Sequence, residues 1–165
     1  MRKNQLLFVA GITAIVFGIG ALGIGVFGIS YTYNRAADEK ITTPEDASIP
    51  EAPVRGPFTM LSQANVIREH TYSSTGGLAY AEMPQKTQAT DDDGNLLVNE
   101  DGSPFMIPNG ARNIWVTSTT LQTALQLGAL AYALSAFAML YGFTSTVTGL
   151  VFLKLRDSKS TPGAM

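Results

Sequence analysis

Two long stretches without acidic or basic side chains constrain this chain most. The first runs from Leu6 to Tyr33 and the second from Leu121 to Leu153, and neither contains Asp, Glu, Lys, Arg or His. A helix needs about 20 apolar residues to cross the hydrocarbon core of a bilayer. Both stretches exceed that length, so we expect two membrane-spanning helices rather than one soluble domain.

A cleaved secretory signal is the alternative interpretation of the first stretch. Arg2 and Lys3 precede it, and the small residues Ala36 and Ala37 follow it. The apolar core of a signal is usually about 7–15 residues long, and this stretch is roughly double that. Its length therefore favours a retained membrane helix.

Charge predicts the orientation of the two helices. Residues 34–120 contain 12 acidic side chains and six Lys or Arg, so the segment between the helices is acidic. Basic residues lie just outside both apolar stretches, at Arg2, Lys3, Lys154, Arg156 and Lys159. Cytoplasmic flanks of membrane helices are enriched in Lys and Arg. We therefore expect a plasma membrane location, with both termini cytoplasmic and residues 34–120 extracytoplasmic.

The fold class that follows is an α-helical membrane protein. It would be a two-helix transmembrane hairpin with a small α+β extracytoplasmic insertion between the helices. Residues 34–57 contain four prolines among charged and small residues, a composition typical of an extended connector. The expected segments are a cytoplasmic N-terminus (1–5), transmembrane helix 1 (6–33), the proline-rich connector (34–57), an extracytoplasmic helix plus β-meander (58–117), transmembrane helix 2 (118–153) and a cytoplasmic tail (154–165).

Helical periodicity begins at Phe58, where apolar residues fall on one face of a predicted short surface helix. Gly76 and Gly77 supply a stop signal, which places Glu69 and His70 near the end of this helix. The second transmembrane helix has a start signal of its own, Thr119 followed by Gln122 at capping-box spacing. The aromatic residues expected at the outer headgroup level are Tyr31, Tyr33 and Trp115.

Three turn signals with glycines eight residues apart follow the short helix, at Asp93-Gly94, Asp101-Gly102 and Asn109-Gly110. Asp-Gly and Asn-Gly favour the positive backbone angles of tight hairpins. Short apolar runs accompany these turns, at 96–98, 105–107 and 114–116. The pattern predicts a small β-meander, with one face covering the helix.

The chain offers few residues for catalysis or metal binding. It has one histidine, His70, and no cysteine, so it cannot supply alone the ligand sets of a typical zinc site or non-haem iron site. A Ser-His-Asp arrangement is formally possible through Ser73 or Ser74, but the chain has no nucleophile elbow. We expect no enzyme activity, no cofactor, and no catalytic, cofactor-binding or metal residues. His70 would then serve a partner contact or a pH-sensitive hydrogen bond.

A calcium loop is the other chemical alternative. Asp91, Asp93, Gly94 and Glu100 match positions of an EF-hand loop, but Ala89 stands at the first ligand position. The flanking residues also resemble strands rather than helices. A solvated acidic hairpin is therefore favoured over a cation site.

Small residues recur every three or four positions along both apolar stretches. Such spacing lines one seam of a helix in left-handed heptad geometry and lets two membrane helices approach closely. The two seams are expected to pack against each other in an antiparallel hairpin, with partner packing or lipid-driven composition as the alternative. The predicted helix-packing seam consists of Gly11, Ala14, Gly18, Ala21, Gly25, Gly28, Ala124, Gly128, Ala131, Ser135, Ala138, Gly142, Ser145 and Gly149.

Three phrases carry a resemblance to known proteins: "ITTPEDA", "GPFTMLSQANVIREHTYSSTGGLAYAEM" and "NIWVTSTTLQTALQLGALAYAL". Across nearly the whole chain, the layout resembles small two-span envelope proteins of actinobacteria. Some similar proteins carry a ring-opening dioxygenase label, which a single histidine makes implausible here. Small two-span accessory chains also occur in the respiratory supercomplexes of those bacteria.

The function expected from the sequence is a non-catalytic accessory or assembly subunit of a multi-subunit membrane complex. The resemblance adds the actinobacterial respiratory cytochrome bc-oxidase supercomplex as a candidate. The expected partners are integral membrane protein subunits and lipid, with no nucleic acid. The alternative is a stand-alone envelope protein whose outer domain binds a ligand or a cell-wall component.

Overall fold

The computed structural model describes residues 3–158, which divide into two compact units. The first unit takes its described residues from 3–41, 53–57 and 128–158, and the second consists of Thr42–Ala52 and Phe58–Leu127. The fold is mostly helical, with a small sheet between two long apolar helices in the sequence.

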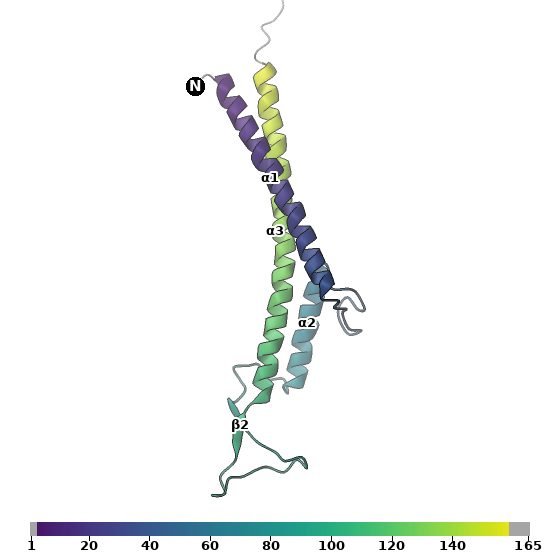
Figure 1. Ribbon diagram of the computed structural model, residues 1–165, viewed down its shortest axis with the longest axis vertical. Helices are drawn as coiled ribbons and strands as arrows, with labels where there is room; N and C mark the ends of the chain where they lie inside the picture. Colours follow the sequence, from purple (N-terminus) through teal and green to yellow (C-terminus); the bar gives the residue numbers. More distant parts are fainter. Residues whose placement is uncertain (1–2, 159–165) are drawn as a thin grey trace, which may run out of the picture. The chain divides into compact units, whose positions relative to one another are not determined.

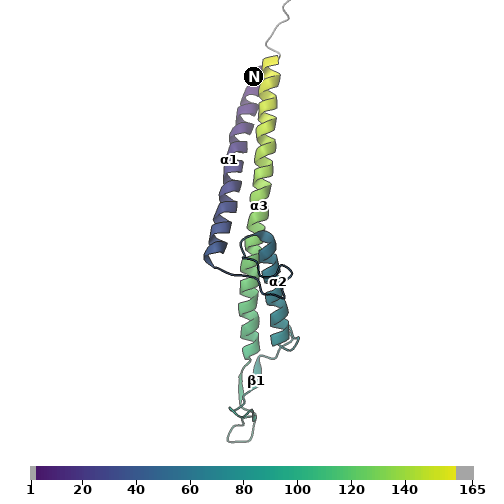
Figure 2. The same ribbon diagram turned by 90° about the vertical axis from the view of Figure 1, so that its right-hand side faces the viewer.

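The first unit is an antiparallel helix pair (Figures 1 and 2). It contains α1 (Lys3–Asp38) and the part of α3 (Gly110–Ser158) that follows Leu127. Both helices are long and apolar enough to cross a membrane, by length and composition. Most of their large apolar side chains face outward, because the pair buries mainly small residues.

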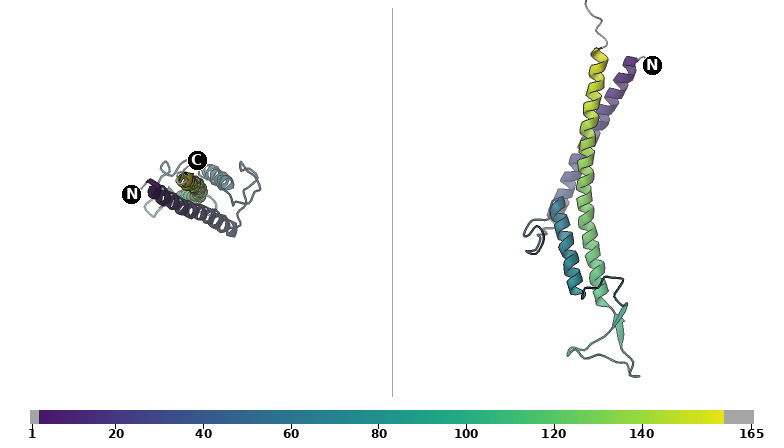
Figure 3. Two further views of the ribbon diagram at one scale, coloured as in Figure 1. Left: turned by 90° about the horizontal axis from the view of Figure 1, so that it is seen from above. Right: turned by 180° about the vertical axis from the view of Figure 1, so that it is seen from behind.

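The second unit is built on α2 (Pro57–Ser74), which lies beside the first turns of α3 (Figures 2 and 3). The helix ends at the predicted glycines. Gly76 adopts a φ of 65°, and the Gly77 N–H donates to the Tyr72 carbonyl oxygen at 2.8 Å. A positive φ followed by this backward bond is the Schellman ending, which satisfies carbonyls left free at a helix end.

The two strands form a hairpin rather than the expected meander. Strand β1 (Lys86–Gln88) pairs antiparallel with β2 (Met106–Pro108), and the isolated bridges Thr90–Leu96 and Val98–Pro104 extend the contact. We call residues 86–108 the acidic arm. It projects beyond the ends of α2 and α3 that it joins (Figure 1), so it does not cover α2 as expected.

Within the acidic arm, three backbone hydrogen bonds close a ring. The N–H of Ala89 donates to the Phe105 carbonyl, that of Phe105 to the Leu97 carbonyl, and that of Leu97 to the Ala89 carbonyl, at 2.8–3.0 Å. These three residues are eight positions apart, like the glycines of the turns between them. Gly94 and Gly102 have φ values of 85° and 81°, which glycine adopts without a Cβ clash.

The expected strand at 114–116 is wrong, because these residues lie inside α3. Asn109 begins that helix rather than a hairpin turn: its Oδ1 accepts the Ala111 N–H at 3.0 Å, as an N-cap residue does. The start signal assigned to Thr119 is therefore also wrong. Trp115, expected among headgroups, is buried in the second unit at 6% exposure.

The connector is less extended than its prolines suggest. Helix α1 continues to Asp38, and residues 42–52 fold back around a buried threonine. The hydroxyl of Thr43 accepts the Ala52 N–H at 2.9 Å and donates to the Ile49 carbonyl at 2.6 Å. These local bonds stabilise the loop where apolar burial alone would not.

Candidate interaction site

The seam between α1 and α3 is formed by glycines that face the opposite backbone. A Cβ added to Gly11 would lie 2.9 Å from the Gly149 carbonyl oxygen, and one added to Gly149 would lie 2.6 Å from that of Gly11. Gly18 and Gly142 show the same reciprocal relation at 2.7 and 2.6 Å. Close approach of this kind maximises van der Waals contact between helices, which drives their association in lipid.

A hydroxyl bonds the two helices directly. The Ser145 Oγ donates to the Ala14 carbonyl oxygen at 2.9 Å, so one predicted seam residue contacts another across the pair. By contrast, the Ser135 Oγ donates to the Ala131 carbonyl within its own helix, and a Cβ on Gly25 would lie 2.7 Å from the Ser135 carbonyl oxygen.

The other predicted seam residues lie at different depths. The half-buried ones are Ala21, Gly28, Gly128, Ala131 and Ala138. Ala124 is exposed and belongs to the second unit, so it lies outside the helix pair. The large side chains expected on the opposite faces are exposed, namely Phe17, Ile24, Phe27, Leu130, Phe137 and Leu140.

Small polar side chains join α2 to α3 in the second unit. The hydroxyls of Thr71 and Ser118 form a short, buried hydrogen bond, and the Gln122 Nε2 donates to the Ser118 Oγ at 2.9 Å. Buried polar groups stabilise a fold when they find partners and cost free energy when they do not. This network was not predicted from the sequence, although the spacing of four residues between Ser118 and Gln122 places both on one face of α3.

Trp115 anchors the same contact from α3. Its Nε1 donates to the Thr75 Oγ1 at 3.1 Å and to the Leu78 carbonyl at 2.8 Å. Its ring meets that of Tyr72 edge to face, with centroids 5.0 Å apart. The indole therefore holds the turn that follows α2 against α3.

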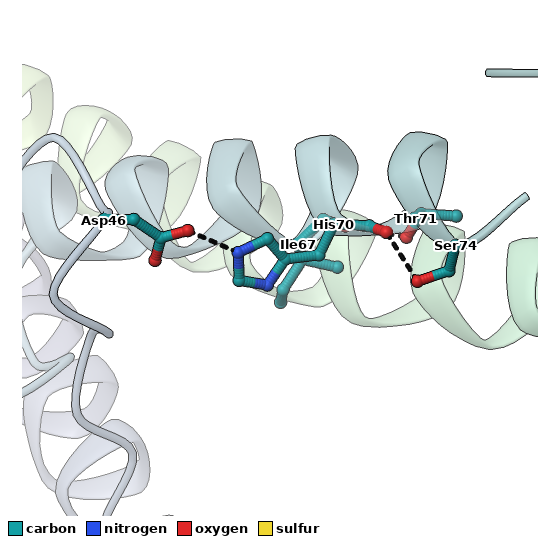
Figure 4. A network of polar contacts seen from close by, with 5 residues as sticks. All are labelled: Asp46, Ile67, His70, Thr71 and Ser74. Carbon is teal, nitrogen blue, oxygen red and sulfur yellow. Dashed lines mark hydrogen bonds and ion pairs between the residues drawn. The ribbon is translucent and has the colours of Figure 1, made fainter. Parts of the chain in front are cut away.

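His70 lies on the exposed side of α2 and contacts the connector loop (Figure 4). Its Nε2 is 2.6 Å from the Asp46 Oδ2, and both side chains are more than half exposed. The hydrogen bond from His70 holds the pKa of the Asp46 carboxyl below its usual value. A second contact between the same elements is the bond from the Ser48 Oγ to the Ser62 Oγ at 2.9 Å.

Within residues 3–158, the His70 ring is hydrogen-bonded to Asp46 and to no serine. Ser74 lies one turn further along α2, and its hydroxyl donates to the His70 carbonyl oxygen at 2.8 Å rather than to the ring (Figure 4). The geometry assigns His70 to the attachment of a loop.

The carboxylates at the turns of the acidic arm cap their own loops. The Asp91 Oδ1 accepts the N–H groups of Asp93 and Asn95, and the Asp101 Oδ1 accepts the Ser103 N–H and hydroxyl. The Asn95 side chain and backbone lower the pKa of Asp91, and Ser103 does the same for the pKa of Asp101. Within residues 3–158, no group of three His, Cys, Asp or Glu side chains could hold a metal ion.

Comparison with known proteins identifies no relative. No protein family, no curated protein and no solved structure matches the chain.

Proposed function

We propose that this chain is a non-catalytic accessory or assembly subunit of a multi-subunit complex in the plasma membrane. In this proposal, α1 and the part of α3 that follows Leu127 cross the bilayer. Both termini are cytoplasmic, and residues 34–120 are extracytoplasmic. The partners are integral membrane subunits, with lipid around the remaining helix faces.

The observation that carries the proposal is the apolar surface of the acidic arm. Leu96, Val98, Phe105 and Met106 are exposed on a two-stranded hairpin. A two-stranded sheet is at best marginally stable in water, and clustered exposed apolar residues mark interaction sites. An interface with another subunit would cover these side chains and stabilise the hairpin.

The membrane helices support a structural role. Their apolar stretches contain no Asp, Glu, Lys, Arg or His, and these are the residue types that form proton relays and ion paths at membrane depth. The resemblance of the sequence to actinobacterial two-span proteins directs the first test to the respiratory cytochrome bc-oxidase supercomplex.

Purification through a C-terminal tag in a mild detergent tests the proposal. We expect integral membrane proteins to co-purify in a fixed stoichiometric ratio, with the same ratio in several gentle detergents. Membranes that contain the untagged chain provide the control for non-specific retention. Recovery of a lone monomer in every detergent would contradict the proposal.

A groove on the second unit favours the alternative of a stand-alone binding protein. It is open, mainly apolar, and bordered by hydroxyls of α3; its lining includes Tyr80, Thr119, Thr123 and Leu127. Under this alternative, the full chain in detergent should show a higher unfolding temperature with one cell-wall fragment or lipid, and should purify alone. The two functions therefore predict opposite results in the same purification.

A further inference from the structure

The acidic arm combines exposed apolar side chains with an excess of negative charge. Residues 86–108 contain five carboxylates, Asp91, Asp92, Asp93, Glu100 and Asp101, and one lysine, Lys86, which gives a net charge of −4. Leu96 and Val98 are 64% and 59% exposed, whereas Leu97 between them is 38% exposed. Alternate residues of an extended segment point to opposite faces, so Leu96 and Val98 share the open face.

From this combination we infer that the acidic arm docks through Leu96 and Val98 into an apolar groove rimmed by Lys and Arg on a partner protein. The inference rests on the proposed function and names the surface and the chemistry of its partner. Apolar side chains supply most of the affinity at such a contact, and complementary rim charges supply specificity and a faster association rate.

The charge of the arm decides among the possible occupants. Segments that lie on membranes usually carry Lys and Arg, because membrane surfaces are anionic. An arm with a net charge of −4 would be repelled there. Two copies of the arm would repel each other for the same reason. A partner protein with basic residues around an apolar groove satisfies both features.

The open face can change without disturbing the ring of backbone bonds. Leu96 and Val98 contribute no backbone group to the ring that joins Ala89, Leu97 and Phe105. Asp92 and Glu100 are exposed, and their side chains lie outside the loop caps made by Asp91 and Asp101. These four positions therefore test recognition separately from folding.

Photo-cross-linking identifies the occupant directly. A photoreactive phenylalanine analogue replaces Leu96 in the full tagged chain, and membranes of the native host are irradiated. Phe58, which is 75% exposed in the same unit but outside the arm, provides the matched control position. We expect position 96, and not position 58, to link to one partner peptide that is apolar and flanked by Lys or Arg. Adducts with lipid, adducts with a second copy, a partner peptide without basic residues, or no adduct would each overturn the inference.

Variants of the full chain measure the strength of the contact. Leu96→Ser combined with Val98→Ser should weaken partner association by about ten-fold or more, whereas Phe58→Ser should not change it. Asp92→Asn combined with Glu100→Gln should weaken partner association by about two- to five-fold for each ion pair lost with a Lys or Arg of the partner. Association of this double variant should also depend less on salt concentration. Unchanged fluorescence of Trp115 would show that the unit still folds.

The outcome separates this inference from the proposed function. If the unaltered chain retains no membrane protein, the proposed function fails. If the unaltered chain and the arm variants retain equal amounts of the same partners, only the inference about the arm is overturned.

Discussion

Gly18 and Gly142 face each other so closely that neither position has room for a Cβ atom. On Gly142 this atom would lie 2.6 Å from the Gly18 carbonyl oxygen, and on Gly18 it would lie 2.7 Å from the Gly142 carbonyl oxygen. Both clashes involve backbone, which cannot rotate away as a side chain can. Relief requires a shift of one helix backbone relative to the other.

We therefore expect Gly142→Ala to destabilise the helix pair by about 1–3 kcal/mol, the usual cost of overpacking. Gly20→Ala is the matched control, because an added Cβ there meets no atom within 4 Å. Thermal unfolding in detergent, followed by circular dichroism, measures both variants. Equal effects at the two positions would contradict a packed glycine seam.

Ser145→Ala should cost less, because it removes one hydrogen bond and leaves the packing intact. Hydrogen bonds between membrane helices contribute on average about 0.6 kcal/mol, with a maximum of about 1.7 kcal/mol. Thr144→Ala is the control, since its hydroxyl donates to carbonyls of its own helix. A loss of stability in Thr144→Ala but not in Ser145→Ala would count against the bond to Ala14.

Trp115→Phe keeps a ring against Tyr72 but removes the N–H that donates to Thr75 and Leu78. The Leu78 carbonyl keeps the Thr75 hydroxyl as a donor at 2.9 Å and loses only the indole N–H. The expected cost is therefore that of a typical hydrogen bond, about 0.5–1.5 kcal/mol. Circular dichroism during thermal unfolding should show the loss, with Val116→Ala on the exposed neighbouring position as the control. An unfolding temperature unchanged from that of the native protein would show that these bonds do not hold the turn.

The pKa of Asp46 should depend on His70. A carboxyl whose pKa is lower in the folded state stabilises the fold above its unfolded value of 3.8 and loses that effect as the pH falls through the folded value. His70→Ala should raise the pKa of Asp46 toward the usual value and should have a mild effect on stability, since both groups are exposed. Carbon NMR titration of the aspartate carboxyls measures the change.

Asp101 provides the internal control for this titration, because Ser103 lowers its pKa and His70 does not contact it. Equal changes at Asp46 and Asp101 in His70→Ala would indicate a general unfolding. No change at either residue would contradict the contact between His70 and Asp46.

The elements that the sequence predicted best are those with a local signal. The two stretches without acidic or basic side chains correspond to helices that could span a membrane. Gly76 and Gly77 end α2 with positive φ angles, which glycine adopts readily because it has no Cβ. The start of α3 was mispredicted because Asn-Gly suits both a hairpin turn and a helix cap. Trp115 is buried against the end of α2, and this contact favours a helix over a strand at residues 114–116. The partner residue Thr75 is 40 positions away, so the local sequence around Trp115 does not reveal the contact.

The contacts across the second unit could not be predicted for the same reason. Asp46 and His70 are 24 residues apart, and Thr71 and Ser118 are 47 apart. Serine and threonine are common in loops and helices, so their presence does not identify a partner. Only the packing of α2 beside α3 brings these hydroxyls together.

The ring of backbone bonds in the acidic arm has a consequence for how the arm can diverge. Two of the bonds join residues that are eight positions apart, and the third joins Ala89 to Phe105, 16 positions away. All three use backbone groups only. Loop side chains that neither cap a turn nor belong to the proposed contact surface can therefore change, provided that Gly94, Gly102, Asp91 and Asp101 are kept. A single-residue insertion or deletion in either loop would break the eight-residue spacing of these bonds. Related arms should consequently keep their length more strictly than the identity of these remaining loop residues.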